Sequence, residues 1–406
     1  MPRALLIQLA RLGDLVQSLP VITSINTLHP ERPLDLLCPA PLAPLGSLFP
    51  GISKVYSWDG AIWQLDSLEA GESWKEQWWQ MKKVWAEQAF LAYPLVYNLN
   101  NHPRSILAAH LLADRVMGPG AWGPVNPRLS AWGEYLRTVA QYRGSNRIHL
   151  SDALCGLCEV RPPRYKPNLC FMETELPMGL ECLRDSSRRP IIGLVLGAGD
   201  PERRIPVAVW SALIQECVAA FPDALMVCIG GKEEREIAFT LENLLPSACC
   251  NRVIDICGRT TLLQLVGVLR QCQWVVGSDT GPLHMGTVCG ARVVGWYFAR
   301  ARVHETGPYG AGHYVWQYTH EGDSDPRKMA ARPPSSGMPR VWPVRETVRV
   351  FLGNPQFSSS GPWSLWTSQH DELGTFYQGH DNSDAGQHTR RTVWDELSPG
   401  LAHLVP

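Results

Sequence analysis

The sequence has no excess of charge of either sign and no long apolar run, and these absences exclude two classes of function. Its 37 Lys and Arg residues are balanced by 38 Asp and Glu residues, so the formal net charge is -1. A nucleic-acid partner normally requires a basic surface, which this composition does not favour. No apolar run reaches the length of a membrane span, and Arg11 and Asp14 interrupt the N-terminal apolar stretch, unlike a signal peptide. We therefore expect a cytoplasmic protein.

Two nucleotide-binding motifs are also missing. No glycine-rich dinucleotide fingerprint follows the first predicted strand, and the sequence contains no phosphate-binding P-loop. These absences argue against NAD-dependent enzymes and nucleoside triphosphatases.

Cysteine and tryptophan, by contrast, are frequent. Most of the 12 cysteines lie in apolar patterns, which is typical of reduced core thiols. Cys155 and Cys158 have metal-like spacing but fall within a predicted helix, so they are either buried thiols or part of a metal site. Three of the 16 tryptophans, together with Met81, mark one face of a helix predicted over residues 65–92: Trp74, Trp78 and Trp85. This face is either core or a platform for a sugar.

Short apolar runs alternate with amphipathic runs along most of the chain, and the connections are short. This βα repetition predicts an α/β fold with doubly wound parallel sheets, and 406 residues suffice for two such domains. Glycine or a charged residue follows each apolar run of the second half, where a nucleotide crevice is expected. The predicted strands are 3–9, 33–38, 54–58, 94–100, 191–196, 224–229, 253–256, 274–277 and 291–296.

One stretch, Ser278–His284, organises the second half. It follows a short β-branched run and leads into a small-residue helix, so Gly281 and Pro282 suit a tight turn and a first helical turn. Free N–H groups at a helix start favour an anion such as phosphate. Asp279 and His284 flank this place and can hold hydroxyl groups; the alternative is an ordinary βα turn capped by Asp279.

The first half carries a second candidate at the end of its first strand. Asp14 follows Gly13 and opens a helix, so it is either an N-terminal cap or a general base at the mouth of the sheet. Three nearby strand-end residues are candidate acceptor ligands: Arg11, Asn100 and Arg104.

Several of these motifs together resemble glycosyltransferase family 9, the bacterial heptosyltransferases. The segments Leu5–Val16 and Val276–Gly290 resemble the opening and the signature of the family. The family's intermediate motifs stand between them in the same order: Gly197–Gly199, Arg203–Pro206, Gly230–Glu234 and Asp255–Leu262.

The resemblance implies a GT-B fold, in which two Rossmann-like domains face each other. We expect an N-terminal acceptor domain over residues 1–165, a donor domain over 186–315, and a linker, crossing helix and extension over 316–406. It also implies inverting transfer of heptose from ADP-heptose to lipopolysaccharide core, with no metal or other cofactor. The expected partners are a nucleotide sugar and a glycan or glycolipid acceptor, with no nucleic acid and peripheral contact with the inner membrane. A nucleotide-sugar epimerase or hydrolase on the same scaffold, or transfer to a protein, are the alternatives.

Site residues follow from the same resemblance, position by position. Asp14 matches the catalytic base. The donor ligands would be Gly197, Arg203, Arg204, Glu234 (or Glu233), Asp279, Thr280, Gly281 and His284. Arginine at 203 stands where the family usually has lysine, which keeps the charge but changes its geometry.

The C-terminal region has a different composition. Residues 326–343 are rich in proline and predict a linker, and Val341–Leu352 predicts a helix that returns to the first domain. Beyond Gly353, aromatic residues predict either packing on the first domain near the tryptophan helix or a disordered tail: Trp363, Trp366, Phe376, Tyr377 and Trp394.

Overall fold

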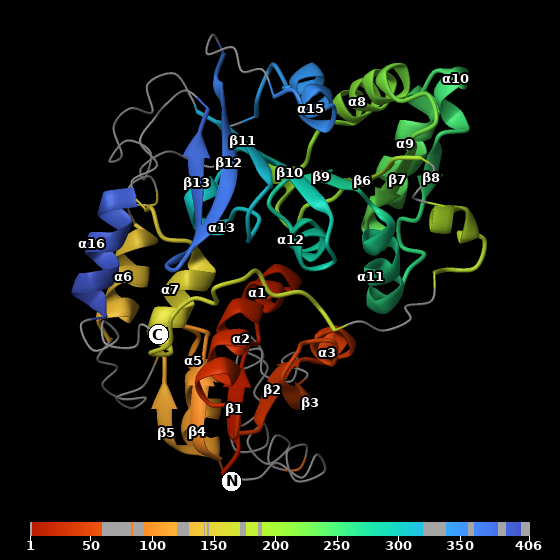
Figure 1. Ribbon diagram of the computed structural model, residues 1–406. Helices are drawn as coiled ribbons and strands as arrows, with labels where there is room; N and C mark the ends of the chain where they lie inside the picture. Colours follow the sequence, from red (N-terminus) through yellow and green to blue (C-terminus); the bar gives the residue numbers. More distant parts are fainter. Residues whose placement is uncertain are drawn as a thin grey trace, which may run out of the picture.

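The chain folds around two sheets, seen in the computed structural model of Figure 1. The structure describes residues 2–58, 83, 93–119, 130–141, 143, 146–170, 176–185, 189–319, 338–355, 361–380 and 387–398. The predicted tryptophan-bearing helix over 65–92 therefore lies outside the described residues, apart from residue 83. We call the unit around each sheet the first and the second domain.

The first sheet is parallel throughout, in the order β3-β2-β1-β4-β5. All residues of β1 are buried, because helices cover both faces of the sheet. Its strands are β1 (Ala4–Ile7), β2 (Leu34–Pro39), β3 (Ile52–Trp58), β4 (Tyr93–Asn98) and β5 (Ala113–Met117). Its helices are α1 (Leu12–Gln17), α2 (Leu19–Leu28), α3 (Ala43–Gly46), α5 (Pro103–Leu112), α6 (Ala131–Val139) and α7 (Leu150–Leu157).

The second sheet repeats the same winding with more strands, in the order β13-β12-β11-β10-β9-β6-β7-β8. Its parallel strands are β6 (Ile191–Val195), β7 (Leu225–Ile229), β8 (Val253–Asp255), β9 (Trp274–Gly277), β10 (Arg292–Tyr297) and β11 (Tyr314–Tyr318). The helices between them are α8 (Val207–Ala220), α9 (Arg235–Leu244), α10 (Ser247–Cys250), α11 (Leu262–Gln271), α12 (Gly281–Val288) and α13 (Val303–Thr306). In both sheets the strand order reverses beside the first strand of the domain, where ligands bind in open α/β sheets. The predicted fold class is thus confirmed.

The C-terminal region completes the second sheet. Two antiparallel strands, β12 (Trp363–Asp371) and β13 (Gly374–Gly379), extend it from β11. The return to the first domain is made by α16 (Gln387–Leu397), which lies beside α6 in Figure 1. Trp394 packs edge-on against Trp132 of α6, with ring centroids 4.3 Å apart.

The helix predicted over residues 341–352 is present, but the prediction that it returns to the first domain was wrong. The segment that contains it forms α15 (Val344–Phe351), which packs on α8 within the second domain. Thr347 accepts a hydrogen bond from the Trp296 indole of β10, and Arg345 pairs with Glu216 of α8. The buried apolar residues of α15 belong to the same core cluster as Trp296, so this face packs within the second domain.

A buried carboxyl group links the C-terminal strands to the first domain. Asp152 of α7 accepts hydrogen bonds from the Tyr309 hydroxyl at 2.8 Å and from the Thr375 N–H of β13 at 2.9 Å. Burial raises the pKa of Asp152 to about 8, although the nearby Arg390 and these hydrogen bonds lower it in part. This group joins three segments that are far apart in sequence.

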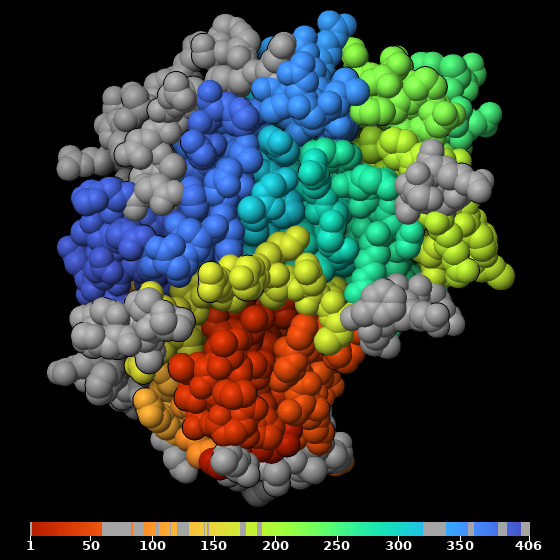
Figure 2. Space-filling model, in the orientation of Figure 1, coloured from red at the N-terminus to blue at the C-terminus, as the bar shows by residue number. Residues whose placement is uncertain are grey.

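The segment that joins the two domains also contacts both of them. A strap of residues 161–170 runs between them, seen as the yellow band in Figure 2. The ammonium group of Lys166 donates to the Thr287 carbonyl at the end of α12, and the Cys170 N–H donates to the Leu48 carbonyl of the first domain. Helix α1 of the first domain faces α12 of the second.

Of the predicted cysteine pair, Cys155 lies in α7 and Cys158 is the C-cap residue of that helix. Cys155 and Cys158 are both buried, and burial raises the pKa of each thiol, which favours the protonated form over the thiolate that binds metal. Within the described ranges, no helix combines the length and the apolar content that a membrane span requires.

Candidate functional site

A crevice of about 450 Å³ separates the two domains where the carboxyl ends of their strands face each other. The first domain contributes the loop after β1 and the start of α1. The second contributes the turns after β6, β7 and β9. The lining residues include Arg11, Asp14, Gly197, Arg203, Glu233, Glu234, Asp279, Thr280, Gly281 and His284. Residues predicted from separate motifs are thus brought to one place.

Asp279 connects several of the residues that the second domain contributes to the crevice. Its carboxylate accepts hydrogen bonds from His284 Nε2 at 3.0 Å and from the Thr306 hydroxyl at 3.1 Å. Arg203 Nη1 donates to the Asp279 carbonyl at 2.6 Å and lies 3.2 Å from the carboxylate. Burial alone would raise the pKa of Asp279, but the hydrogen bond and charge of His284, with the Arg203 charge and the Thr306 hydrogen bond, bring it below its usual value. The site therefore holds a fixed carboxylate that is ionised at neutral pH.

The start of α12 differs from the simple capped turn that the sequence also allowed. The N-cap residue is Thr280, in extended conformation, and its side chain makes no capping hydrogen bond. Asp279 is turned instead toward His284, one helical turn further on. The N–H groups at the start of this eight-residue helix are therefore not capped by a side chain.

Glu234 occupies the part of the crevice after β7. It is 8% exposed, and its carboxylate accepts a hydrogen bond from the Gly231 N–H at 2.8 Å. A Cβ atom on Gly197 would lie 2.5 Å or less from this carboxyl group. Glycine is therefore required at 197 so that the Glu234 side chain can lie across the end of β6. Glu233 lines the same crevice, so both residues considered from the sequence are near the cavity.

Asp14 faces these groups from the first domain. It is the third residue of α1, and its Oδ2 accepts a hydrogen bond from the Arg11 N–H at 3.1 Å. The contact expected if Asp14 caps the start of α1 is therefore present. One hydrogen bond leaves carboxylate lone pairs free, so the same group can also accept a proton from a ligand in the crevice.

The two helix starts meet closely at the crevice. A Cβ atom on Gly281 would lie 2.8 Å from the Leu12 side chain, so the missing side chain at 281 allows α1 to approach α12. One turn along α1, the amide of Gln17 lies 3.1 Å from His284 Nε2. The position of His284 is thus fixed by both domains.

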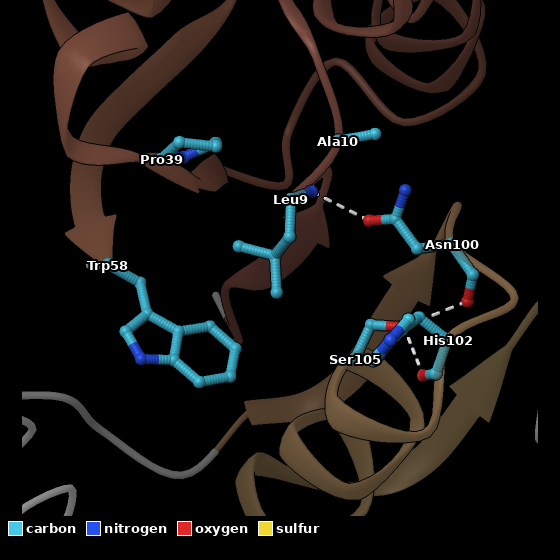
Figure 3. Close-up of a pocket in the computed structure, with 7 residues that line it drawn as sticks. All are labelled: Leu9, Ala10, Pro39, Trp58, Asn100, His102 and Ser105. Atoms are coloured by element: carbon cyan, nitrogen blue, oxygen red, sulfur yellow. Dashed lines mark hydrogen bonds between the residues drawn. The ribbon is translucent and has the colours of Figure 1, made fainter. Parts of the chain in front are cut away.

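A smaller hollow of about 220 Å³ lies in the first domain, beyond the strand ends (Figure 3). Asn100 lies at its wall, and its Oδ1 accepts a hydrogen bond from the Leu9 N–H at 2.6 Å. The other lining residues are Leu9, Ala10, Pro39, Trp58, His102 and Ser105. Because Ala10 precedes Arg11, this hollow and the crevice lie on either side of one short loop.

Two predicted ligands, Arg204 and Arg104, are not among the described residues that line the crevice. Arg204 does not line the crevice, and its Nε lies 3.4 Å from the Ala198 carbonyl. Arg104 is the second residue of α5, but its side chain lies outside the described residues. Arg11, predicted on the acceptor side, lines the crevice itself.

Sequence reasoning missed Gln17 and Thr306, which both contact the Asp279–His284 pair. Gln17 lies on the buried side of a predicted amphipathic helix. A polar residue at such a position indicates a hydrogen-bond partner elsewhere in the fold. Thr306 lies beyond the last predicted strand and gave no such signal. Among the described residues, no group of three or more His, Cys, Asp or Glu side chains is placed to hold a metal ion.

Comparison with known proteins agrees with this arrangement. Residues 165–332 match the sequence model of glycosyltransferase family 9 (heptosyltransferase). The matched region is a family 9 glycosyltransferase domain. The match confirms the resemblance and the assignment as a glycosyltransferase, and the matched region contains every predicted donor ligand. No curated protein matches the chain.

Solved structures extend the family 9 likeness in fold to both domains. Escherichia coli ADP-heptose LPS heptosyltransferase II aligns with a TM-score of 0.59 and 20% identity, over 80% of this chain and 96% of that one. A family 9 glycosyltransferase from Veillonella parvula aligns with a TM-score of 0.60 and 17% identity, over 81% and 90%. E. coli heptosyltransferase WaaC with ADP aligns with a TM-score of 0.57 and 16% identity, over 76% and 91%. These likenesses support the GT-B fold.

Proposed function

We propose that the protein transfers a heptose, or a related sugar, from a nucleotide sugar to a cell-envelope glycan such as lipopolysaccharide core. The observation that carries this proposal is the shared crevice, which places Asp14 of one domain opposite Arg203, Asp279 and His284 of the other. ADP-heptose is the first donor to test, because E. coli WaaC has been solved with ADP and with ADP-2-deoxy-2-fluoro heptose on the same fold.

In the proposed reaction, residues of both domains have a role. An acceptor hydroxyl attacks the anomeric carbon of the donor sugar, the new C–O bond forms on the face opposite the diphosphate, and the configuration inverts. The old C–O bond breaks and its electron pair stays on the diphosphate oxygen. Asp14 takes the proton of the acceptor hydroxyl as the new bond forms. Asp279 would hold sugar hydroxyls, and Glu234 would hold the nucleoside.

The leaving diphosphate gains negative charge as the old bond breaks. The N–H groups of Thr280 and Gly281, at the start of α12, and the Arg203 guanidinium are the groups that would offset this charge. We propose that these groups take the part that a metal plays in other transferases. The transfer would take place in the cytoplasm, with the acceptor bringing the protein to the inner face of the inner membrane.

The acceptor would enter through the first domain. The hollow lined by Asn100 and Trp58 (Figure 3) also includes Leu9 and Ala10, which lead directly into the residues 11–14 that line the crevice. An indole and a side-chain amide suit a sugar ring, since the first packs against its apolar face and the second binds hydroxyl groups.

A panel of nucleotide sugars, incubated with the full chain and followed by mass spectrometry, tests the proposal. Transfer requires that nucleoside diphosphate be released only when a glycan acceptor is present and that the acceptor gain the mass of the sugar. Release or isomerisation of the sugar without any acceptor would instead identify a hydrolase or an epimerase. A mass gain on a protein acceptor would replace the glycan as substrate.

A further inference from the structure

We infer that Arg11, which the first domain supplies, binds the diphosphate of a donor held by the second domain. The inference rests on the proposed function and reassigns Arg11, for which the sequence predicted an acceptor role. It makes donor binding a joint property of both domains.

The position of Arg11 carries the first part of the argument. Arg11 is the N-cap residue of α1, and its side chain is exposed in the crevice rather than packed against its own domain. A Cβ atom on Gly199 would lie 3.7 Å from Arg11 Nη1. Gly199 belongs to the loop between β6 and α8, which also carries Arg203. The Arg11 guanidinium therefore extends across the crevice to the loop that carries Arg203, a predicted ligand of the donor's phosphates.

The charges in the crevice carry the second part. Among the described lining residues the permanent cations are Arg11 and Arg203. Arg203 already faces the Asp279 carboxylate, which offsets much of its charge. No ion pair of the Arg11 guanidinium is found within the described part of the chain. A diphosphate that enters the crevice therefore meets, in Arg11, a cation without an ion-pair partner among the described residues.

The chemistry of the leaving group favours the same residue. A guanidinium binds two phosphate oxygens at once, in a planar geometry that lysine cannot reproduce. Because the group comes from the opposite domain, its contact with the diphosphate draws the domains together. Such a contact strengthens as charge develops on the diphosphate, so it would stabilise the transition state more than the bound donor.

Calorimetric titration of the wild-type protein with ADP, UDP, GDP, CDP and dTDP first identifies the nucleoside diphosphate that binds. That ligand and its monophosphate are then titrated into Arg11→Ala, Arg11→Lys and, as a matched control, Arg137→Ala. Arg137 lies on the exposed surface of α6 and pairs only with Glu134 among the described residues, so its loss should not affect the crevice.

We expect Arg11→Ala to bind the diphosphate about tenfold more weakly and the monophosphate less than about threefold more weakly. The loss should shrink as salt is raised from about 50 to about 300 mM, because screening weakens the wild-type contact. Arg11→Lys should recover part of the affinity, and Arg137→Ala should match the wild type.

Two results would contradict different claims. Unchanged diphosphate affinity in Arg11→Ala, with a raised KM for the acceptor, would overturn the inference and return Arg11 to the acceptor side while the proposed function stands. A wild-type protein that binds none of the five diphosphates would overturn the proposed function itself, together with the inference that rests on it.

Discussion

The amide of Gln17 lies 3.1 Å from Nε2 of His284, and the same nitrogen lies 3.0 Å from the Asp279 carboxylate. Helix α1, which carries Asp14, is thereby connected to the carboxylate that would hold the donor sugar. All three side chains lie mostly out of solvent, so the contact is little weakened by water.

This contact predicts energetic coupling between the domains. His284→Ala should lower the free energy of unfolding by about 1–3 kcal/mol, because it removes a hydrogen bond from the Asp279 carboxylate and the polar partner of the Gln17 amide. Gln17→Ala should lower it by less, because Nε2 of His284 keeps its hydrogen bond to Asp279. The double variant should lose less than the sum, with a coupling of at least about 0.5 kcal/mol, measured by urea unfolding. Additive losses would show that the two side chains do not interact.

Arg203 and Arg204 are adjacent in sequence but differ in position. Arg203→Ala should weaken donor binding about tenfold or more, in a salt-dependent way, because the side chain lines the crevice. Arg204→Ala should weaken it less than about threefold, since Arg204 does not line the crevice and its Nε is directed to the Ala198 carbonyl. Calorimetry measures the donor affinity of both variants. A larger loss in Arg204→Ala than in Arg203→Ala would contradict the position of Arg203 in the crevice.

The buried Asp152 predicts a pH dependence of stability. In the unfolded chain this carboxyl group ionises near its ordinary pKa of 3.8, whereas the folded protein holds the proton up to a pH of about 8. Between these values the unfolded state binds fewer protons, so this group lowers the free energy of unfolding as pH rises, by up to about 1.4 kcal/mol per pH unit. Asp152→Asn, which does not titrate, should therefore gain stability relative to the wild type between pH values of about 5 and 7.5.

Urea unfolding at the two pH values measures this difference. Asp395→Asn, on the exposed surface of α16, is the control and should show no such gain. A constant difference between Asp152→Asn and the wild type at both pH values would show that Asp152 is ionised in the folded state throughout.

The aromatic contact of α16 predicts that the C-terminal helix stabilises the first domain. Trp394 is 5% exposed and packs on Trp132, so Trp394→Ala should cost about 3 kcal/mol and lower the thermal midpoint. Thr392→Ala, on the exposed side of the same helix, should leave it unchanged. Equal midpoints for both variants, with rapid proteolysis after Gly353, would instead support the alternative of a tail that does not pack.

Local patterns were enough to predict β6 to β10 of the second domain, which begin and end within two residues of the predicted strands. Buried parallel strands such as β6 and β9 are continuous apolar runs, which leave little ambiguity. β5 was missed because α5 runs into it with no turn residue between them. The strands β11 to β13 were missed because their stability comes from pairing with β10 and with each other, not from a local pattern.

The site was predictable to a similar degree and for similar reasons. Residues at strand ends, such as Asp14 and Asp279, follow from the winding of each domain and converge as expected. The partners of His284 do not follow from it, since Gln17 is 267 positions away and comes from the other domain. The destination of α15 was wrong for the same reason, because only tertiary packing decides which sheet an amphipathic helix covers.

The central claim is that Asp14 takes the proton of the acceptor in the crevice between the domains. The most direct measurement is the rate of nucleoside diphosphate release by Asp14→Asn, with donor and acceptor both saturating. Asparagine can still accept the hydrogen bond from the Arg11 N–H, so the fold and α1 should be kept. The account predicts a rate lower by about two orders of magnitude or more, with donor affinity close to that of the wild type. A rate equal to that of the wild type would contradict it.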